Sequence, residues 1–486
     1  MTAATAELRP MFIGGRPAPA ASGASREAVN PATGEVLALV PEAGRDDVDR
    51  AVQAAQEAFP GWRRVPANER AAAISALADR IMEHAEELAV LDVVDNGSPI
   101  AEMRNDARLA AALMRYIAGA AMLVRGHTVP TMTGRLNYSL HQPFGVVGKI
   151  VPFNHPLLFA ARGIAAPLVT GNTLVLKPSE HTSLSALRLA ELAADLFPPG
   201  VLNVITGDGA VAGDAIVRHP VIRRIHFTGS DVTGRRILLA ANADRLATVT
   251  LELGGKNPLV IFPDADIDVA VEAAVRGMNF TWQGQSCGST SRLLVHRDLY
   301  PAVIDRLGAA IESMRAGPPL AEDTQTGSIV NAAQLAKVEQ YIKIGLDEGA
   351  RLVTGGRRLT EGAFGSGLFV PPTLFSDVTP GSRLEQEEIF GPVLAAMPFG
   401  SYEEALKIAN GVPYGLTASV FTGALGIAHR FAADVEAGYV WVNEVSRHVL
   451  GVPFGGVKNS GLGREEDLEE LYSYTETKNV HVNFDA

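Results

Sequence analysis

Residues 145–177 read GVVGKIVPFNHPLLFAARGIAAPLVTGNTLVLK, and this stretch decides the fold. Short apolar runs at its two ends, Val146–Val151 and Thr173–Leu176, are typical of buried strands. Similar runs follow at Val201–Ile205, Ile225–Phe227 and Val249–Leu253. Between the second and the third run, apolar residues keep helical spacing from Leu184 to Phe197. Strands that alternate with helices predict an α/β protein with a parallel sheet and right-handed crossovers.

The flanking sequence extends this organisation in both directions. Ala and Leu recur at helical spacing from about Asp46 to Ala121, which predicts a helical opening segment. A second α/β series follows the first, and we expect the domain boundary near Gly254 and Gly255. The predicted elements of the second series are a strand at Arg292–Val295 and helices around Ile267–Asn279, Leu299–Ser313 and Ala332–Glu348.

Two segments far apart in the sequence alternate apolar and polar residues, namely Arg135–His141 and Val480–Phe484. This alternation predicts strands that are exposed or that pair with other strands. We interpret both as strands that join chains into an oligomer. The alternative is a pair of solvated edge strands in a monomer.

Composition limits the classes of partner. The chain has 486 residues, of which 47% are hydrophobic and 20% charged, and this predicts a folded protein of several domains. Its net charge of −12 offers no basic surface, so neither nucleic acid nor membrane is an expected partner. No apolar run reaches membrane length, and Met1–Gly15 lacks a basic segment followed by an apolar one, so we expect a cytoplasmic location.

Polar residues and glycines follow the predicted strands, at the edge where an open parallel sheet binds its ligands. Asn154 follows the first strand, Lys177 the second, Gly207–Gly213 the third and Gly229–Ser230 the fourth. One crevice is therefore predicted to collect them. The segment GDGAVAG at 207–213 departs from the dinucleotide fingerprint, because three residues separate its second and third glycines. A tight turn with close helix packing is an equal alternative for it.

Cys287 is the one cysteine of the chain, which rules out an internal disulfide and a multi-cysteine metal site. It lies in GQSCG (284–288), among small polar residues that are unlike an apolar core. This context favours a nucleophile, and a buried structural cysteine is the alternative. A free thiol has a pKa of about 8.5, so a nucleophile here needs a base or a positive potential nearby.

Glu252 ends the otherwise apolar run VTLEL (249–253), directly before Gly254, Gly255 and Lys256. A carboxylate in an apolar strand costs free energy unless it is paired or used. Partial burial would raise its pKa toward the range that suits a general base. The alternative is a salt bridge to Lys256.

Seven motifs, in one order between about residues 150 and 460, resemble those of the aldehyde dehydrogenase superfamily. They are PFNHP (152–156), KPSE (177–180), FTGS (227–230), LELGGK (251–256), GQSC (284–287), EIFGP (388–392) and PFGGVKNSG (453–461). The stretch NPATGE (30–35) also fits, so the resemblance covers nearly the whole chain.

The resemblance implies a fold in three parts. It implies a Rossmann-like cofactor domain from residues 1–122 and 144–253 and an α/β catalytic domain from 254–460. A small β oligomerisation element would come from 123–143 and 470–486, and the protein would be a homodimer or homotetramer. The two alternating segments described above fall within this third part.

The resemblance also implies NAD-dependent oxidation of an aldehyde to a carboxylic acid. Cys287 would attack the aldehyde carbon, while the Asn154 side chain and the Cys287 backbone N–H would hold the developing oxyanion. Hydride would then leave for the nicotinamide. Glu252 would activate the water that hydrolyses the resulting thioester.

Lys177 and Glu180 would bind the adenosine ribose, and Glu388 with Phe390 would bind the nicotinamide ribose. A carboxylate at position 180 accepts hydrogen bonds from ribose hydroxyls and repels a 2′-phosphate, so we expect NAD rather than NADP as the preferred cofactor. The remaining implied cofactor contacts are Val151, Pro152, Phe153, Gly209, Gly213, Phe227, Gly229, Ser230 and Leu253.

Two departures from the family pattern concern the shape of the site: Phe153 replaces a frequent Trp, and Ser286 and Gly288 flank the nucleophile where larger or cysteine residues are common. The aromatic residues of the implied substrate tunnel favour an apolar or aromatic aldehyde. Arg162 leaves three roles open: binding a substrate carboxylate as in semialdehyde dehydrogenases, supporting an aromatic tunnel, or forming a structural ion pair. The implied tunnel residues are Leu158, Phe159, Arg162, Thr281, Trp282, Ser446, His448 and Phe454.

Individual residues and motifs argue against other functions for this chain. Glu252 counts against a dehydrogenase that transfers the acyl group to coenzyme A, and the set Asn154, Glu252 and Cys287 counts against a catalytically silent relative. The sequence contains no Gly-x-x-x-x-Gly-Lys-Ser/Thr motif, which excludes a P-loop protein. No metal is expected, because the histidines lack ligand spacing with one another and with Cys287.

Overall fold

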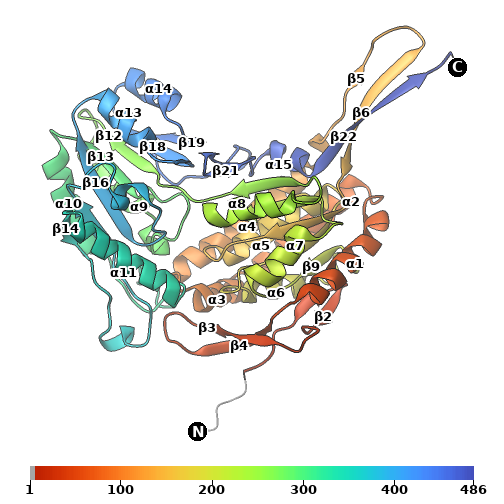
Figure 1. Ribbon diagram of the computed structural model, residues 1–486, viewed down its shortest axis with the longest axis horizontal. Coiled ribbons are helices and arrows are strands. Elements are labelled where there is room, and N and C mark those ends of the chain that lie inside the picture. Colours follow the sequence, from red (N-terminus) through yellow and green to blue (C-terminus); the bar gives the residue numbers. More distant parts are fainter. Residues whose placement is uncertain (1–5, 486) are drawn as a thin grey trace.

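The computed structural model describes residues 6–485. Residues 1–5, at the start of the expected cofactor domain, and residue 486, at the end of the expected oligomerisation segment, lie outside the described residues. The fold is α/β, as predicted, and is built on two mainly parallel sheets (Figure 1).

The first sheet contains all five strands predicted after residue 145, each within two residues of its predicted bounds. Its central strands β9, β8, β7, β10 and β11 are parallel, while β1 and β21 add an antiparallel neighbour on either side. In sheet order the strands are β2 (Arg16–Ala18), β1 (Met11–Ile13), β9 (Leu202–Val204), β8 (Thr173–Lys177), β7 (Val146–Ile150), β10 (Arg224–Thr228), β11 (Thr248–Glu252) and β21 (Gly461–Leu462).

The order of these strands creates the place for a ligand. The chain runs from β7 outward through β8 to β9, then returns to the other side of β7 with β10 and continues to β11. The direction of winding therefore reverses between β7 and β10. At such a switch point the loops after the two strands diverge to opposite faces and leave a crevice at the carboxyl edge of the sheet.

Helices cover both faces of the first sheet. Alternate residues of β8 point into different cores: Leu174 and Leu176 pack in one, Val175 in the other. This alternation explains why the strand reads as a continuous apolar run. Helices α2 (Ala67–Glu83), α3 (Ala85–Asn96), α4 (Ile100–Ala120), α5 (Pro156–Val169) and α6 (Leu184–Leu192) pack on one face, and α1 (Arg45–Trp62), α7 (Asp214–Arg218) and α8 (Asp231–Ala241) on the other.

The second sheet begins just after Gly254 and Gly255, where the boundary was expected. Its strands are parallel except β14, which pairs antiparallel with β15. In order they are β14 (Arg351–Thr354), β15 (Thr373–Ser376), β16 (Val393–Phe399), β13 (Arg292–His296), β12 (Pro258–Ile261), β18 (Thr417–Phe421) and β19 (Tyr439–Val442). Helices α9 (Ile267–Gly277) and α10 (Tyr300–Glu312) cover one face, and α11 (Ala332–Asp347), α13 (Tyr402–Asn410) and α14 (Leu425–Asp434) the other.

The two alternating segments pair with each other. Strands β5 (Thr128–Val129), β6 (Arg135–Pro143) and β22 (Thr475–Asn483) form a three-stranded antiparallel sheet that projects from the body as an arm (Figure 1). The pairing of β6 with β22 runs without interruption from Arg135 opposite Asn483 to Pro143 opposite Thr475. The second segment is longer than predicted, because its strand begins at Thr475 rather than near Val480.

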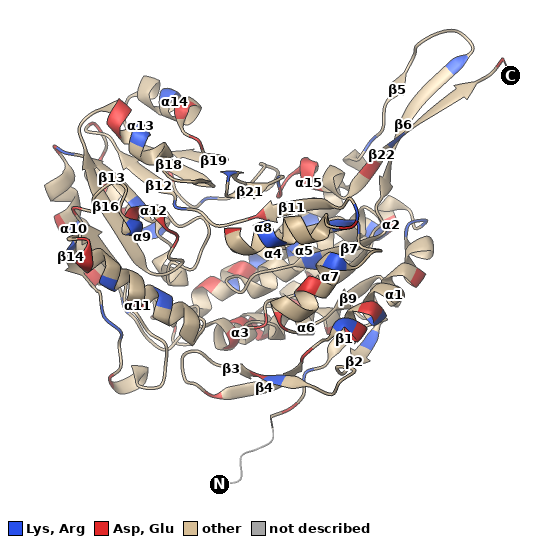
Figure 2. Cartoon of the chain, viewed as in Figure 1, with Lys and Arg blue, Asp and Glu red and all other residues tan. Residues whose placement is uncertain are grey.

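The remaining elements are short. They include the hairpin of β3 (Ser25–Val29) and β4 (Val36–Pro41), the pair of β17 (Tyr414–Gly415) and β20 (Val457–Lys458), and helices α12 (Arg383–Gln386) and α15 (Leu468–Ser473). Figure 2 shows acidic and basic residues mixed along the helices rather than gathered by sign. Within residues 6–485, no helix has the length and apolar character needed to cross a membrane.

Candidate active site

A cavity of about 940 Å³ occupies the switch point at the carboxyl edge of the first sheet. All sixteen residues named from the sequence as catalytic or cofactor-binding line this one cavity. They come from loops after β7, β8, β9, β10 and β11 and from two segments of the second sheet's half of the chain, around Cys287 and Glu388. The crevice predicted from the polar residues that follow the strands is thus present, and its far wall comes from the part of the chain that forms the second sheet.

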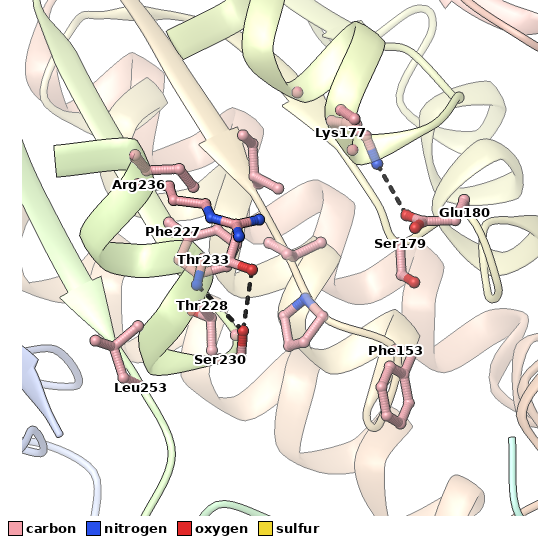
Figure 3. A pocket seen from close by; sticks show the side chains of 18 of the residues that line it. Phe153, Lys177, Ser179, Glu180, Phe227, Thr228, Ser230, Thr233, Arg236 and Leu253 are labelled. Carbon is pink, nitrogen blue, oxygen red and sulfur yellow. Dashed lines mark hydrogen bonds and ion pairs between the residues drawn. The ribbon is translucent and has the colours of Figure 1, made fainter. Parts of the chain in front are cut away.

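One end of the cavity holds an ion pair, with Lys177 Nζ 3.4 Å from Glu180 Oε2 (Figure 3). Lys177 ends β8 and is almost fully buried, and its Nζ also donates to the carbonyl of Pro178 at 2.9 Å. Burial lowers the pKa of Lys177. Burial opposes ionisation of Glu180 as well, but the adjacent Lys177 keeps the pKa of Glu180 below its ordinary value. A cation and a carboxylate therefore face the cavity side by side, an arrangement suited to the hydroxyls of a ribose.

The next part of the cavity lies at the start of helix α8. Ser230 caps this helix by accepting a hydrogen bond from the backbone N–H of Thr233 at 3.3 Å, and its hydroxyl donates to Thr233 Oγ1 at 3.0 Å (Figure 3). A Cβ on Gly229 would lie 2.4 Å from Cζ of Phe227, so any larger residue there would require the Phe227 ring to move. The free N–H groups and dipole of a helix N-terminus favour anions. The part of the cavity at the start of α8 therefore fits the diphosphate of a dinucleotide.

The glycine segment forms neither the standard fingerprint nor a tight turn. Gly209–Gly213 makes one wide helical turn that continues into α7. Asp208 begins it, accepting a hydrogen bond from the N–H of Ala210 at 2.6 Å. Gly209 and Gly213 both line the cavity, so the segment contributes backbone surface to the site.

Glu388 and Phe390 form the opposite wall. Glu388 Oε1 accepts a hydrogen bond from the N–H of Gly255 at 3.0 Å, which ties this loop to the end of β11. Burial raises the pKa of Glu388. The rings of Phe390 and Phe153 meet edge to face with centroids 5.6 Å apart. Phe153, which replaces a frequent Trp of the family, therefore packs against the wall rather than leaving a gap.

Cys287 lies in the loop between the short helix η3 (Phe280–Trp282) and β13. The side chain of Asn257 donates to the Cys287 carbonyl at 2.7 Å and to that of Ser289 at 3.0 Å, and so holds the loop on both sides. Burial, with Glu252 and Glu388 adding to it, raises the pKa of Cys287 to about 12. The thiol is therefore protonated at neutral pH in the free protein, and its reaction requires transfer of that proton.

Glu252 ends β11 inside the cavity and is 4% exposed. Within residues 6–485 neither carboxylate oxygen has a hydrogen-bond partner, so the salt bridge to Lys256 considered from the sequence is not formed. Burial raises the pKa of Glu252 well above its ordinary value, Glu465 raises it further, and Arg162 works in the opposite direction. An unpaired carboxylate with a raised pKa, beside a thiol, has the properties of a general base.

A buried ionic cluster lies behind Glu252. Arg162 Nη2 is 2.6 Å from Glu465 Oε2, and Arg162 Nη1 is 3.2 Å from Glu466 Oε1. Lys149 Nζ is 3.3 Å from Glu465 Oε1, and His226 Nε2 is 3.2 Å from the same oxygen. Burial opposes ionisation of Glu465, but Arg162 foremost among these neighbours lowers its pKa. Arg162 is thus already matched by two ionised carboxylates.

Of the eight tunnel residues expected from the sequence, only Phe159 lines the cavity; the other seven lie outside its wall. Several of them form two aromatic groups nearby. Phe159 and Trp282 each contact the ring of His155, at centroid distances of 5.8 and 5.4 Å. His448 and Phe454 meet at 4.7 Å, and His448 Nδ1 is 3.1 Å from Glu466 Oε2.

Several residues at the site were not anticipated from the sequence. Glu465 and Glu466 lie just beyond the C-terminal motif, and nothing local indicates that they face Arg162. Arg236 lies in the second turn of α8 and its side chain lines the cavity (Figure 3), but its exposed helical position carries no sequence signal. The additional lining residues include Ser179, Thr233, Arg236, Asn331, Gln334 and Lys337. Within the described part of the chain, no group of three or more His, Cys, Asp or Glu residues could hold a metal ion.

Comparison with known proteins agrees with this geometry. A sequence model of the aldehyde dehydrogenase family matches residues 19–480. The aldehyde dehydrogenase tropH of Talaromyces stipitatus is 43% identical over 468 residues, which cover 94% of this chain and 90% of that protein.

Two solved structures superpose closely. The NAD⁺ complex of aldehyde dehydrogenase from Bacillus cereus has a TM-score of 0.95 and 42% identity, and the match covers 99% of this chain and 97% of that one. PnpE in complex with nicotinamide adenine dinucleotide has a TM-score of 0.95 and 41% identity, with 98% of each chain covered. The enzyme class expected from the sequence motifs is confirmed: this chain belongs to the aldehyde dehydrogenase family.

Proposed function

We propose that this protein oxidises an aldehyde to a carboxylic acid with NAD, through a thioester on Cys287. The observation that carries the proposal is the single cavity that joins the Lys177–Glu180 pair and the start of α8 to Asn154, Glu252 and Cys287. The likeness to aldehyde dehydrogenase structures that contain NAD supports the choice of cofactor.

In the first step the thiol of Cys287 gives its proton to solvent water and its sulfur bonds to the aldehyde carbon, while the carbonyl π electrons move to oxygen. The side-chain amide of Asn154 and the backbone N–H of Cys287 donate hydrogen bonds to that oxyanion. Asn154 and Cys287 line the same cavity, and the hydrogen bond from Asn96 Nδ2 at 3.1 Å goes to the Asn154 backbone carbonyl rather than to its carboxamide. Each such donor contributes roughly 3–4 kcal/mol to the transition state in other enzymes.

NAD, when bound, supplies the acceptor for the hydride whose departure converts the thiohemiacetal to a thioester. Glu252 then accepts a proton from water, and the resulting hydroxide adds to the thioester carbon. Collapse of this adduct breaks the carbon–sulfur bond, releases the carboxylic acid and returns the Cys287 sulfur. The raised pKa of Glu252 makes its carboxylate a stronger base than an exposed one.

The residues around Glu180 support NAD over NADP. Its carboxylate accepts hydrogen bonds from ribose hydroxyls, and its negative charge opposes a 2′-phosphate. Lys177 holds this carboxylate at the cavity end and keeps it ionised. The hydroxyl of Ser179 also lines this part of the cavity and adds a polar contact for the ribose.

For the substrate we propose an apolar or aromatic aldehyde. Phe159, Trp282 and His155 form an aromatic group beside the Asn154 loop, which suits a flat apolar substrate. The alternative, a semialdehyde whose carboxylate binds Arg162, is less favoured because Glu465 and Glu466 already neutralise that guanidinium. Arg162 is better described as part of a structural ion cluster that borders the site.

The proposal also covers the domain organisation, the oligomeric state and the location of the protein. The cofactor domain would comprise residues 1–122 and 144–253, the catalytic domain 254–460, and the arm 123–143 with 470–486. The outer edge of β22 pairs with no further strand among residues 6–485, and this edge supports a homodimer or homotetramer formed through strand pairing. We propose a cytoplasmic location and no nucleic acid or membrane partner, in line with the acidic net charge of −12.

The test is to incubate the purified protein with NAD or NADP and with aliphatic, aromatic and carboxylated aldehydes, following absorbance at 340 nm beside Cys287→Ala. We expect cysteine-dependent reduction of NAD, with aromatic aldehydes the best substrates. Reduction that persists in Cys287→Ala would refute the thioester route. Equal turnover of all three aldehyde classes would refute the substrate proposal alone.

A further inference from the structure

The two groups proposed to hold the oxyanion come from different halves of the chain. Asn154 follows β7 of the first sheet, whereas Cys287 precedes β13 of the second. Both donors must reach the same oxygen at about 2.7–3.1 Å, and a misplacement of about 1 Å in an active site can cost roughly 100-fold in rate. Something in the protein must therefore fix one loop relative to the other.

Asn96, the last residue of helix α3, holds the Asn154 loop. Its side chain is fully buried, and its Nδ2 donates to the carbonyls of Phe153 at 2.8 Å and Asn154 at 3.1 Å. Its Oδ1 accepts a hydrogen bond from the N–H of Ser98 at 2.8 Å. The loop that carries the Asn154 carboxamide is thus attached to α3 through two of its own backbone carbonyls.

A chain of buried polar side chains continues from this point toward Cys287. The hydroxyl of Ser98 donates to Oε1 of Gln283 at 3.2 Å, and Nε2 of Gln285 donates to the same oxygen at 3.3 Å. Gln285 is two residues before Cys287, and its Oε1 accepts from the N–H of Val330 at 3.2 Å. Gln283 has a left-handed backbone with φ of 54°, which this network holds in place.

We infer that the hydrogen-bonded chain Asn96–Ser98–Gln283–Gln285 is a positioning device that sets the Asn154 carboxamide against the Cys287 loop. Asn96 is its main positioning residue and touches neither substrate nor cofactor. All four side chains are at most 1% exposed, so a broken bond leaves a buried polar group without a partner. The inference rests on the proposed role of Asn154 and adds residues to which the proposed function gives no task.

The test is a double-mutant cycle between Asn96 and Asn154. We expect Asn96→Ala to lower kcat at saturating NAD and aldehyde by 10- to 100-fold, with the dissociation constant for NAD within 2-fold of the unmodified protein. In the Asn154→Ala background the same substitution should lower kcat by less than 3-fold, because the group that it positions is gone.

Asn203 provides a matched control. It is equally buried, and its Nδ2 also donates to two carbonyls, of Leu174 at 3.2 Å and Gly200 at 2.8 Å, while its Oδ1 accepts from the N–H of Gly14 at 2.9 Å. These contacts lie away from the cavity. Asn203→Ala should lower stability much as Asn96→Ala does, yet change kcat by less than 3-fold.

Ser98→Ala removes only the hydroxyl in the middle of the chain and serves if Asn96→Ala does not fold. We expect a 3- to 10-fold loss of kcat, which again disappears in the Asn154→Ala background. Effects that multiply in the double variants, or a loss no larger than that of Asn203→Ala, would overturn the inference. A normal kcat for Asn154→Ala alone would instead refute the proposed role of Asn154 itself.

Discussion

Replacement of Arg162 by Met distinguishes a structural guanidinium from one that binds substrate. A charge-assisted hydrogen bond to a substrate carboxylate contributes roughly 1.5–3 kcal/mol, so its loss would lower kcat/KM for carboxylated aldehydes roughly 10- to 150-fold relative to neutral ones. In the structure both terminal nitrogens of Arg162 face Glu465 and Glu466 instead. We therefore expect the ratio of kcat/KM for a neutral aromatic aldehyde to that for a carboxylated aldehyde to change by less than 3-fold.

The stability of the same variant should fall. Removal of one partner from a buried ion pair costs about 3–5 kcal/mol, because the other charge stays buried without compensation. Thermal inactivation should therefore occur at a lower temperature in Arg162→Met and recover in part in the double variant Arg162→Met/Glu465→Gln. Arg162→Lys is the control that keeps the charge. A loss confined to carboxylated aldehydes, without loss of stability, would refute the structural role and restore the semialdehyde alternative.

Three further outcomes are expected. The variant Glu252→Gln should form about one NADH per active site and then stop at the thioester, which lowers steady-state kcat by roughly 100-fold or more. Absorbance at 340 nm after rapid mixing measures this burst. Undiminished turnover would exclude Glu252 as the base. In the unmodified protein kcat should rise with pH, and its midpoint should lie above the pH at which an exposed glutamate titrates, since burial raises the pKa of Glu252 and its basic form accumulates only on deprotonation. A profile that falls as pH increases would contradict this. The variant Glu180→Gln should raise the ratio of kcat/KM with NADP to kcat/KM with NAD by about 10-fold, because removal of the carboxylate charge relieves repulsion of the 2′-phosphate. An unchanged ratio would show that other residues determine the preference for NAD.

The sequence predicted local features well because their causes are local. Each strand of the first parallel series reads as an apolar run, since residues such as Leu174 and Val175 are buried on opposite faces. The ends of those strands predicted the cavity, and the motifs predicted the residues that line it. Lys177, Asn154 and Glu252 all lie where a parallel sheet exposes its carboxyl edge.

The rest depended on contacts between distant segments. The order of strands, which places β7 between β8 and β10, is set by packing and has no sequence signal. The partners of Arg162 lie about 300 residues further along the chain, as the separation of 304 between Arg162 and Glu466 shows. Asn96 ends a helix as an ordinary polar residue would, and only the folded chain shows which loop it holds.

The antiparallel strand β21 has a consequence for how the chain folds during synthesis. It pairs Leu462 with Leu251 and Gly461 with Glu252, so β11 lacks its outer neighbour until the ribosome has made residues beyond 460. At about 5–20 residues per second, roughly 10–40 s separate the synthesis of Glu252 from that of Gly461. During that interval the edge of β11 is open to strands of other nascent chains. A chaperone that holds the unfinished chain, or termination of translation before Gly461, would leave the first sheet without β21 beside Glu252, the proposed general base. Completion of the active site is therefore delayed until almost the whole polypeptide has emerged.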